Sequence, residues 1–205
     1  MAATAVRYLR SVGAPTATEP FEAPPATSGR YPHPRPELRA VGDDERLPVE
    51  PGEYRRVLGH FATGVTVVTA YDEDGPAGFA CQSFASLSLD PPLVAFMVAR
   101  TSTTWPRVAR AGAFCVNVLG AEQGELCQGF AVSGADKFAG VTYDRAPATG
   151  APRLDSVPAW IDCTIQTVHT GGDHLIVVGR VAALGAVDEG VPLLFHRGRF
   201  GRFTP

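Results

Sequence analysis

The first ordered part of the chain changes from a helical to a strand-like hydrophobic period. Over residues 53–61, four apolar side chains recur at helical spacing, which predicts an amphipathic helix. Residues 64–71 are rich in β-branched side chains and end at the turn signal Asp72-Glu73-Asp74-Gly75, so they predict a strand. Residues 78–89 follow as a second strand, and the two together predict a hairpin.

The next apolar run predicts a buried strand. Residues 93–99 (LVAFMVA) are continuously apolar, which is typical of a strand buried on both faces. Asp90-Pro91-Pro92 separates this run from residues 78–89 and ends that strand, because proline cannot donate to a strand ladder.

The second half of the chain continues with short elements. Pro106 fits the first turn of a short helix that Thr103 or Thr104 caps, with Trp105, Val108 and Ala109 on its inner face. The remaining predicted elements are strands at 113–119, 160–168, 174–184 and 193–203, the last with a turn at 197–199, and a weak helix at 123–130.

This order of elements predicts a mainly β fold. Long helical crossovers between strands are largely missing, which favours an antiparallel barrel with a few short helices over a doubly wound parallel sheet. No G-x-G-x-x-G follows a strand, so a Rossmann site is not supported.

Composition divides the chain near residue 50. Residues 1–50 contain eight prolines and keep no hydrophobic period, so we expect a disordered or loosely attached tail, followed by one domain over residues 51–205. The net charge of −3 gives no basic footprint for nucleic acid. The apolar runs are too short to span a membrane, and the N-terminus lacks the apolar core of a signal peptide, so we expect a cytoplasmic protein.

Four cysteines are present, at positions 81, 115, 127 and 163. None belongs to a C-x-x-C pair, and no histidine lies at metal-ligand spacing beside them. We expect reduced, buried cysteines and no metal site.

Three segments carry candidate ligand-binding chemistry. Residues 78–94 (GFACQSFASLSLDPPLV) form a hydroxyl-rich, strand-like ribbon that can face a flat or anionic ligand. Residues 100–104 (RTSTT) join a strand to a helix start and suit a phosphate, although two of these hydroxyls can simply compete to cap the helix.

The third segment, Gly171-Gly172-Asp173-His174, is a tight turn before a strand. It places His174 near the surface, where the imidazole can hold a ligand or donate a proton, or can be an exposed turn residue. A separate loop carries Lys137, which can reach a phosphate or remain solvated.

Six motifs occur in the order that they have in a known family. After residues 78–94 come residues 100–106 (RTSTTWP), 114–119 (FCVNVL), 136–140 (DKFAG), 172–174 (GDH) and 192–201 (PLLFHRGRFG). With these motifs the chain resembles the flavin reductase-like family over about residues 50–203. These are small NAD(P)H:flavin oxidoreductases with an FMN-binding split barrel, a Greek-key antiparallel fold. The segment GFACQSF at residues 78–84 is most similar to that of reductase components that serve actinobacterial steroid and aromatic hydroxylases.

The resemblance implies roles for individual residues. The residues implied to line the isoalloxazine ring, largely through backbone groups, are Ala80, Cys81, Gln82 and Ser83. Those implied at the ribityl and phosphate end are Ser86, Leu87, Ser88, Arg100, Ser102, Thr103 and Lys137. His174 is implied to meet the nicotinamide nucleotide and is the one implied catalytic residue. Many relatives read T-A-N-S-F-T-S at residues 80–86, so this chain lacks hydroxyls at Ala80 and Ala85, and the choice between FMN and FAD stays open.

The implied reaction is hydride transfer from NADH or NADPH to FMN or FAD, from nicotinamide C4 to flavin N5. Cofactors carry this chemistry, which agrees with the lack of an acid–base dyad in the chain. Reduced flavin would pass to a separate oxygenase component, and the family implies a homodimer. Two alternatives stay open: a split-barrel enzyme that keeps its flavin and acts directly on a small molecule, and a non-catalytic flavin-binding protein.

Overall fold

The computed structural model describes residues 49–134 and 136–204, so almost all of the predicted tail lies outside the described residues. The chain divides into two units, residues 1–54 and 55–205. Of the first unit only residues 49–54 are described. Helix α2 (Pro51–Leu58) begins there, which confirms the helix predicted from the helical period. The remaining helices and strands all belong to the second unit.

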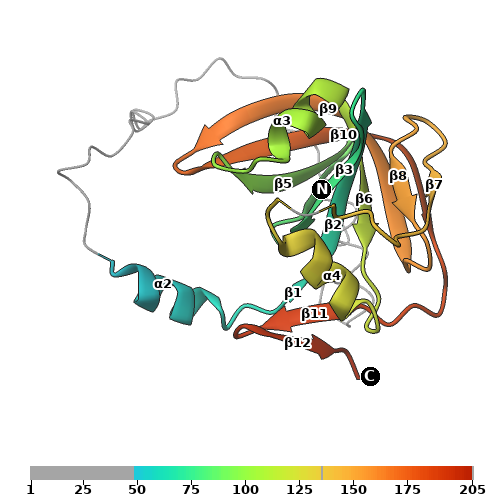
Figure 1. Cartoon of the computed structure of the whole chain (residues 1–205). Helices are drawn as coiled ribbons and strands as arrows, with labels where there is room; N and C mark the ends of the chain where they lie inside the picture. Colours follow the sequence, from blue (N-terminus) through green and yellow to red (C-terminus); the bar gives the residue numbers. More distant parts are fainter. Residues whose placement is uncertain (1–48, 135, 205) are drawn as a thin grey trace, which may run out of the picture. The chain divides into compact units, whose positions relative to one another are not determined.

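A seven-stranded antiparallel sheet dominates this unit, in the order β3-β2-β6-β9-β10-β5-β4 (Figure 1). Its strands are β2 (Thr66–Asp72), β3 (Gly75–Cys81), β4 (Ala85–Leu89), β5 (Pro92–Ala99), β6 (Ala113–Val118), β9 (Ala159–Gly171) and β10 (His174–Ala186). Strands β3 and β4 are neighbours in the chain but occupy opposite edges of the sheet. The sheet therefore curls until its edges approach each other, which confirms the antiparallel split barrel.

Smaller elements complete the unit. A three-stranded sheet has the order β1-β11-β12, and its hairpin turn, Arg197-Gly198, has positive φ at both residues, as a type I′ turn requires. Helix α4 lies between the large sheet and this hairpin (Figure 1). The bounds are β1 (Thr63–Gly64), β11 (Leu193–His196), β12 (Arg199–Arg202), β7 (Tyr143–Arg145), β8 (Pro152–Leu154), α3 (Trp105–Ala111) and α4 (Gly124–Ala131).

The predicted strand over residues 78–89 is wrong, because the chain forms two strands there. β3 pairs with β2, whereas β4 pairs with β5 in a different part of the sheet. Residues 82–84 carry the chain from one edge to the other. The serine-rich ribbon thus crosses the split of the barrel.

The expectation that residues 93–99 are buried on both faces is also wrong. In β5 the side chains of Val94, Phe96 and Val98 are buried, while Met97, on the opposite face, is 43% exposed. The strand therefore has one core face and one open face, although both are apolar.

The buried side chain of Asn117 ties the large sheet to the neighbouring strand β8. The Asn117 amide Nδ2 donates to the Val67 carbonyl at 3.2 Å, and its Oδ1 accepts the Leu154 N–H at 2.8 Å. These bonds join β6 to β2 and to β8. Gly179 in β10 has no room for a side chain, since a Cβ there would lie 2.3 Å from Phe114 Cζ in the core.

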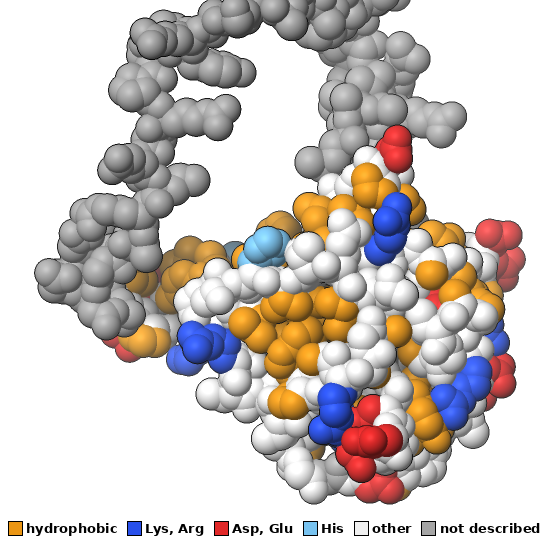
Figure 2. All heavy atoms as spheres, turned by 90° about the horizontal axis from the view of Figure 1, so that it is seen from above, with side chains coloured by type: hydrophobic (Ala, Val, Ile, Leu, Met, Phe, Trp, Pro, Cys, Tyr) orange, Lys and Arg blue, Asp and Glu red, His pale blue; other side chains and the backbone are white. Residues whose placement is uncertain are grey.

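Some charged side chains form ion pairs between α3 and the end of β2. Arg107 and Arg110 of α3 both bind the Asp72 carboxylate, and Arg110 also binds Asp74. At the lower edge of the face seen in Figure 2, basic and acidic side chains lie next to each other. Among the described residues, no helix is long and apolar enough to cross a membrane.

Candidate functional site

A cleft of about 680 Å³ opens where the two edges of the barrel approach. Its size is in the range of small-molecule and cofactor sites. It is lined by residues of β3, β5, the segment after β5, α4, and the β11–β12 hairpin. Apolar and aromatic walls come from Phe79, Met97, Cys127, Phe130, Phe195 and Phe200. Such walls suit a flat, conjugated ligand.

At Met97, which lines the cleft, the Ser83 side chain makes the hydrogen bonds to β5 that a neighbouring strand would otherwise make. The ladder between β4 and β5 ends at the pair Ala85–Ala95, so Met97 has no partner in β4. Ser83 Oγ accepts the Met97 N–H at 3.0 Å and donates to the Met97 carbonyl at 2.9 Å. The single O–H donor of Ser83 is thereby used within the protein and is not available to a ligand.

Cys81 lies next to this contact. Its Sγ is 3.4 Å from Ser83 Oγ, and the residue is only 5% exposed. Burial raises the pKa of the Cys81 thiol, which keeps it protonated and unreactive. All four cysteines are free and buried, as predicted, and burial raises the pKa of Cys115 and of Cys163 to about 12.

The loop after β5 supplies hydroxyls to the cleft. Thr104, one of the two predicted candidates, occupies the N-cap position of α3 but makes no side-chain cap bond; Ser102 Oγ instead accepts the Trp105 N–H at 3.2 Å. Ser102, Thr103 and Thr104 all line the cleft. In α3 itself, Val108 is buried as predicted but Ala109 is exposed.

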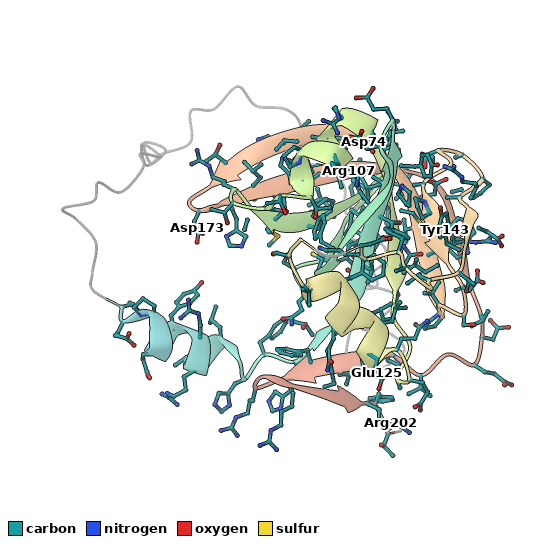
Figure 3. The ribbon with its side chains drawn as sticks, in the orientation of Figure 1. Asp74, Arg107, Glu125, Tyr143, Asp173 and Arg202 are labelled. Atoms are coloured by element: carbon teal, nitrogen blue, oxygen red, sulfur yellow. The ribbon has the colours of Figure 1, made fainter. Side chains whose placement is uncertain are left out.

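His174 lies at the first residue of β10, after the two-residue turn Gly172-Asp173. The Arg100 N–H donates to the Asp173 carbonyl at 3.0 Å, which fastens this turn to the end of β5. The Asp173 carboxylate lies 2.7 Å from His174 Nδ1, and this hydrogen bond lowers the pKa of Asp173. Figure 3 shows Asp173 at the tip of the β9–β10 hairpin. The His174 ring is 46% exposed and lines the cleft.

Lys137 is not a solvated lysine. Its Nζ donates to the Gly78 carbonyl in β3 at 3.2 Å and to the Phe130 carbonyl near the end of α4 at 3.1 Å. Partial burial lowers the pKa of Lys137. An ammonium has three donors, so one remains for a ligand in the cleft that this side chain lines.

The structure brings together eight of the twelve residues that the resemblance implied. Those in the cleft are Ala80, Cys81, Gln82, Ser83, Ser102, Thr103, Lys137 and His174. Ser86, Leu87 and Ser88 lie on edge strand β4, and Arg100 is exposed at the end of β5; none of these four lines the cleft. The ligand contacts of all twelve residues remain predictions.

Several residues that line the cleft were not predicted from the sequence as site residues. Met97 was hidden in an apolar run, and Phe195 and Phe200 come from a hairpin far along the chain. The pairing of Phe195 with Phe200 in the β11–β12 ladder was readable from the turn at 197–199, but its position against β3 and α4 depends on the tertiary fold. Among the described residues, no cluster of histidine, cysteine or carboxylate side chains could hold a metal.

Comparison with known proteins decides the family. The flavin reductase like domain matches residues 58–204, nearly the whole described chain. The protein belongs to the flavin reductase-like family. All six motifs on which the resemblance rested lie within the matched residues, and five of them contribute residues to the cleft.

Three relatives illustrate the range of this family. The reductase subunit HsaB of a flavin-dependent monooxygenase from Rhodococcus jostii is 48% identical over 77% of this chain and 80% of that protein. An NADH:FMN oxidoreductase from Rhodococcus qingshengii is 37% identical over 75% of this chain and 82% of that protein. The solved structure of the Streptomyces globisporus NADH:FAD oxidoreductase SgcE6, in complex with NAD and FAD fragments, is 36% identical, with a TM-score of 0.72 over 78% of this chain and 98% of that chain.

Proposed function

We propose that this protein is an NAD(P)H-dependent flavin reductase that supplies reduced flavin to a separate monooxygenase component. The observation that carries the proposal is the cleft at the split of the barrel, where five of the six motifs converge. The relatives named reductase subunit, NADH:FMN oxidoreductase and NADH:FAD oxidoreductase support this reaction and this kind of partner.

The residues present fit a flavin. An isoalloxazine ring needs apolar walls and backbone hydrogen-bond groups, and the crossing segment at residues 80–83 offers such groups beside Met97 and Phe79. A flavin phosphate needs hydroxyl and cationic donors, which Ser102, Thr103 and Lys137 offer among the residues that line the cleft. When bound, the flavin supplies the hydride-accepting chemistry.

The protein contributes binding and orientation. His174 stands at the rim of the cleft, where its ring can hold the nicotinamide nucleotide over the flavin site. Hydride transfer needs a fixed distance between two rings rather than a proton donor. The buried Cys81 thiol, with its raised pKa, takes no part as a nucleophile.

Three further points belong to the proposal. Residues 51–205 form the reductase domain and residues 1–50 a proline-rich extension; the family match over residues 58–204 supports this division. The protein works as a homodimer, as the family resemblance implies. It is cytoplasmic, which four free cysteines support, since exported proteins commonly oxidise theirs.

An oxidation assay tests the proposal. Purified protein is mixed with NADH or NADPH and with FMN, FAD or riboflavin, and nicotinamide absorbance is followed; flavin in the protein is measured before and after. Rapid oxidation that depends on added flavin supports the reductase. Flavin that copurifies tightly, with little turnover of free flavin, indicates instead an enzyme that keeps its flavin. Flavin binding without any NAD(P)H oxidation contradicts both enzyme readings.

A further inference from the structure

Met97 carries a sulfur atom that differs from the others in its exposure. The sequence contains four cysteines and two methionines. All four thiols are buried, and burial raises the pKa of each, so none of them is present as the thiolate that oxidants attack. Met1 lies outside the described residues. Within the described part of the chain, Met97 is therefore the one sulfur-containing residue that is exposed, at 43%.

The Met97 side chain belongs to the cleft in which the proposed function places the flavin. It lines this cleft together with Phe79 and residues 80–83, and it lies on the face of β5 opposite to buried Phe96. Ser83 binds the N–H and the carbonyl of Met97 at 3.0 and 2.9 Å, which fixes the backbone from which the thioether projects. An oxidant that forms in this cleft thus has the Met97 sulfur within the same walls.

The proposed reaction produces such an oxidant when its product is not consumed. Two electrons and two protons pass from reduced flavin to O2, which gives oxidised flavin and hydrogen peroxide. Hydrogen peroxide transfers one oxygen atom to a thioether, so that the O–O bond breaks, an S–O bond forms, the sulfur loses two electrons and water leaves. The one co-reactant beyond those of the proposed reaction is O2.

A sulfoxide at position 97 would change the wall of the cleft. The oxidation converts a flexible apolar side chain into a polar one. The Ser83 hydroxyl cannot donate to the new oxygen, because its single donor is used by the Met97 carbonyl. Flavin bound against this wall would cover the sulfoxide oxygen without a hydrogen bond, which raises the Kd about tenfold.

We propose that Met97 is a redox-sensitive site whose oxidation lowers the flavin affinity of this protein when reduced flavin accumulates in air. Peroxide formed in the cleft converts Met97 to the sulfoxide, and the oxidised protein binds flavin weakly and turns over slowly. The site limits further peroxide production while no oxygenase takes up reduced flavin, and methionine sulfoxide reductases reverse the change. The inference rests on the proposed function, because the proposed reaction is the source of the peroxide.

The main experiment measures oxygen incorporation and flavin affinity after turnover. Wild type and Met97→Leu are incubated with NAD(P)H and FMN, once in air and once without O2, and are then freed of ligands. Peptide mass spectrometry locates added oxygen, and fluorescence titration gives the Kd of FMN. We expect one oxygen on the Met97 peptide of the wild type and an about tenfold higher Kd, after incubation in air alone. Met97→Leu has a similar volume and no sulfur, so its Kd should stay at its own starting value.

Leu184→Met is the matched control, because it adds a second thioether outside the cleft. Leu184 is 67% exposed on β10 and does not line the cleft. Hydrogen peroxide added to the solution should oxidise both thioethers of this variant, whereas turnover in air should oxidise Met97 ahead of position 184. Methionine sulfoxide reductases, one for each epimer, should then remove the oxygen and restore the Kd, a measurement that the wild type alone provides.

Several results would overturn the proposal. They are turnover in air without oxygen on Met97, oxidation of Met97 with an unchanged Kd of FMN, and an equal loss of affinity in Met97→Leu. Oxidation of position 184 ahead of Met97 also contradicts it, because the peroxide then acts from solution. If the wild type oxidises no NAD(P)H with any flavin, the proposed function fails instead; peroxide added directly then shows, by a rise or no rise in the Kd of FMN, whether Met97 controls flavin affinity.

Discussion

The Ser83 hydroxyl and the Met97 backbone form two hydrogen bonds where the barrel is split. Ser83 Oγ accepts the Met97 N–H at 3.0 Å and donates to the Met97 carbonyl at 2.9 Å. One side chain thus pairs both backbone groups of a residue that lies beyond the end of the β4–β5 ladder. The contact joins the segment leaving β3 to β5 and holds Met97 in the floor of the cleft.

Replacing the Ser83 hydroxyl should weaken the contact between the segment after β3 and strand β5. Ser83→Ala leaves two backbone groups unpaired, and because Met97 is partly exposed, water replaces part of the loss. We expect the free energy of unfolding to fall by about 1 kcal/mol, the low end for an unmade hydrogen bond, and Tm by about 2–4 °C. Hydrogen exchange at the Met97 amide should become fast. Ser86→Ala, an exposed position in β4, is the control and should leave both measurements unchanged.

Local signals explain why most elements could be predicted. The alternation of apolar and polar residues over 160–168 and the β-branched run at 64–71 each depend on the residues of a single strand. Both strands are present, as β9 and β2. The Gly-Asp turn before His174 and the Arg-Gly turn before Arg199 likewise require only the residues that form them. The short strands β7 and β8 carry no such signal, being three residues each, and were missed.

The errors arise where distant parts of the chain meet. Residues 78–89 look like one strand because every residue tolerates extended structure, but β5 can pair only with the second half. The sequence suggests that the Met97 side chain is buried, because its neighbours are apolar. It is partly exposed because the sheet curls and leaves this face of β5 open to the cleft. Lys137 looks solvated because the two carbonyls that bind it are distant in sequence or belong to a helix end. These contacts follow from closure of the barrel, which no local period encodes.

His174→Ala should affect use of NADH more than binding of flavin. The ring lines the cleft at its rim and is fastened through Asp173 to the end of β5. Loss of one ligand hydrogen bond corresponds to about a tenfold higher KM for NADH, with the Kd of FMN changed little. Steady-state kinetics and flavin titration measure the two quantities. His169→Ala, on β9 outside the cleft, is the control; equal effects of the two substitutions would contradict the role.

Asp72 should control stability at acid pH. Its side chain is 4% exposed and accepts hydrogen bonds from Arg107 and Arg110, and the bond from Arg107 is the largest of the causes that hold the pKa of Asp72 far below its ordinary value of 3.8. A carboxyl whose pKa is lower in the folded state stabilises the fold above the unfolded pKa and loses this effect as pH falls below it.

We therefore expect the Tm of the wild type to fall steadily below about pH 4, where the unfolded chain begins to bind protons that the folded chain does not. Asp72→Asn should melt at a lower temperature at neutral pH and show a flatter acid limb. Asp74→Asn is the control, because the Asp74 side chain is 65% exposed and, of the two arginines of α3, only Arg110 pairs with it. Equal melting curves for the two variants would mean that Asp72 has no special role.

Lys137 should make flavin binding depend on pH through the phosphate. Burial lowers the pKa of Lys137 from 10.5, so the ammonium loses its proton at a lower pH than a free lysine does. As pH rises through that lowered pKa, the attraction to phosphate is lost, and FMN should bind more weakly while riboflavin, which has no phosphate, is unaffected. Fluorescence titration of both flavins from neutral to alkaline pH measures the difference. In Lys137→Arg the charge persists, so the FMN affinity should stay level over the same range; in Lys137→Met it should be low throughout. An FMN affinity that falls equally in the wild type and in Lys137→Arg would show that another group titrates.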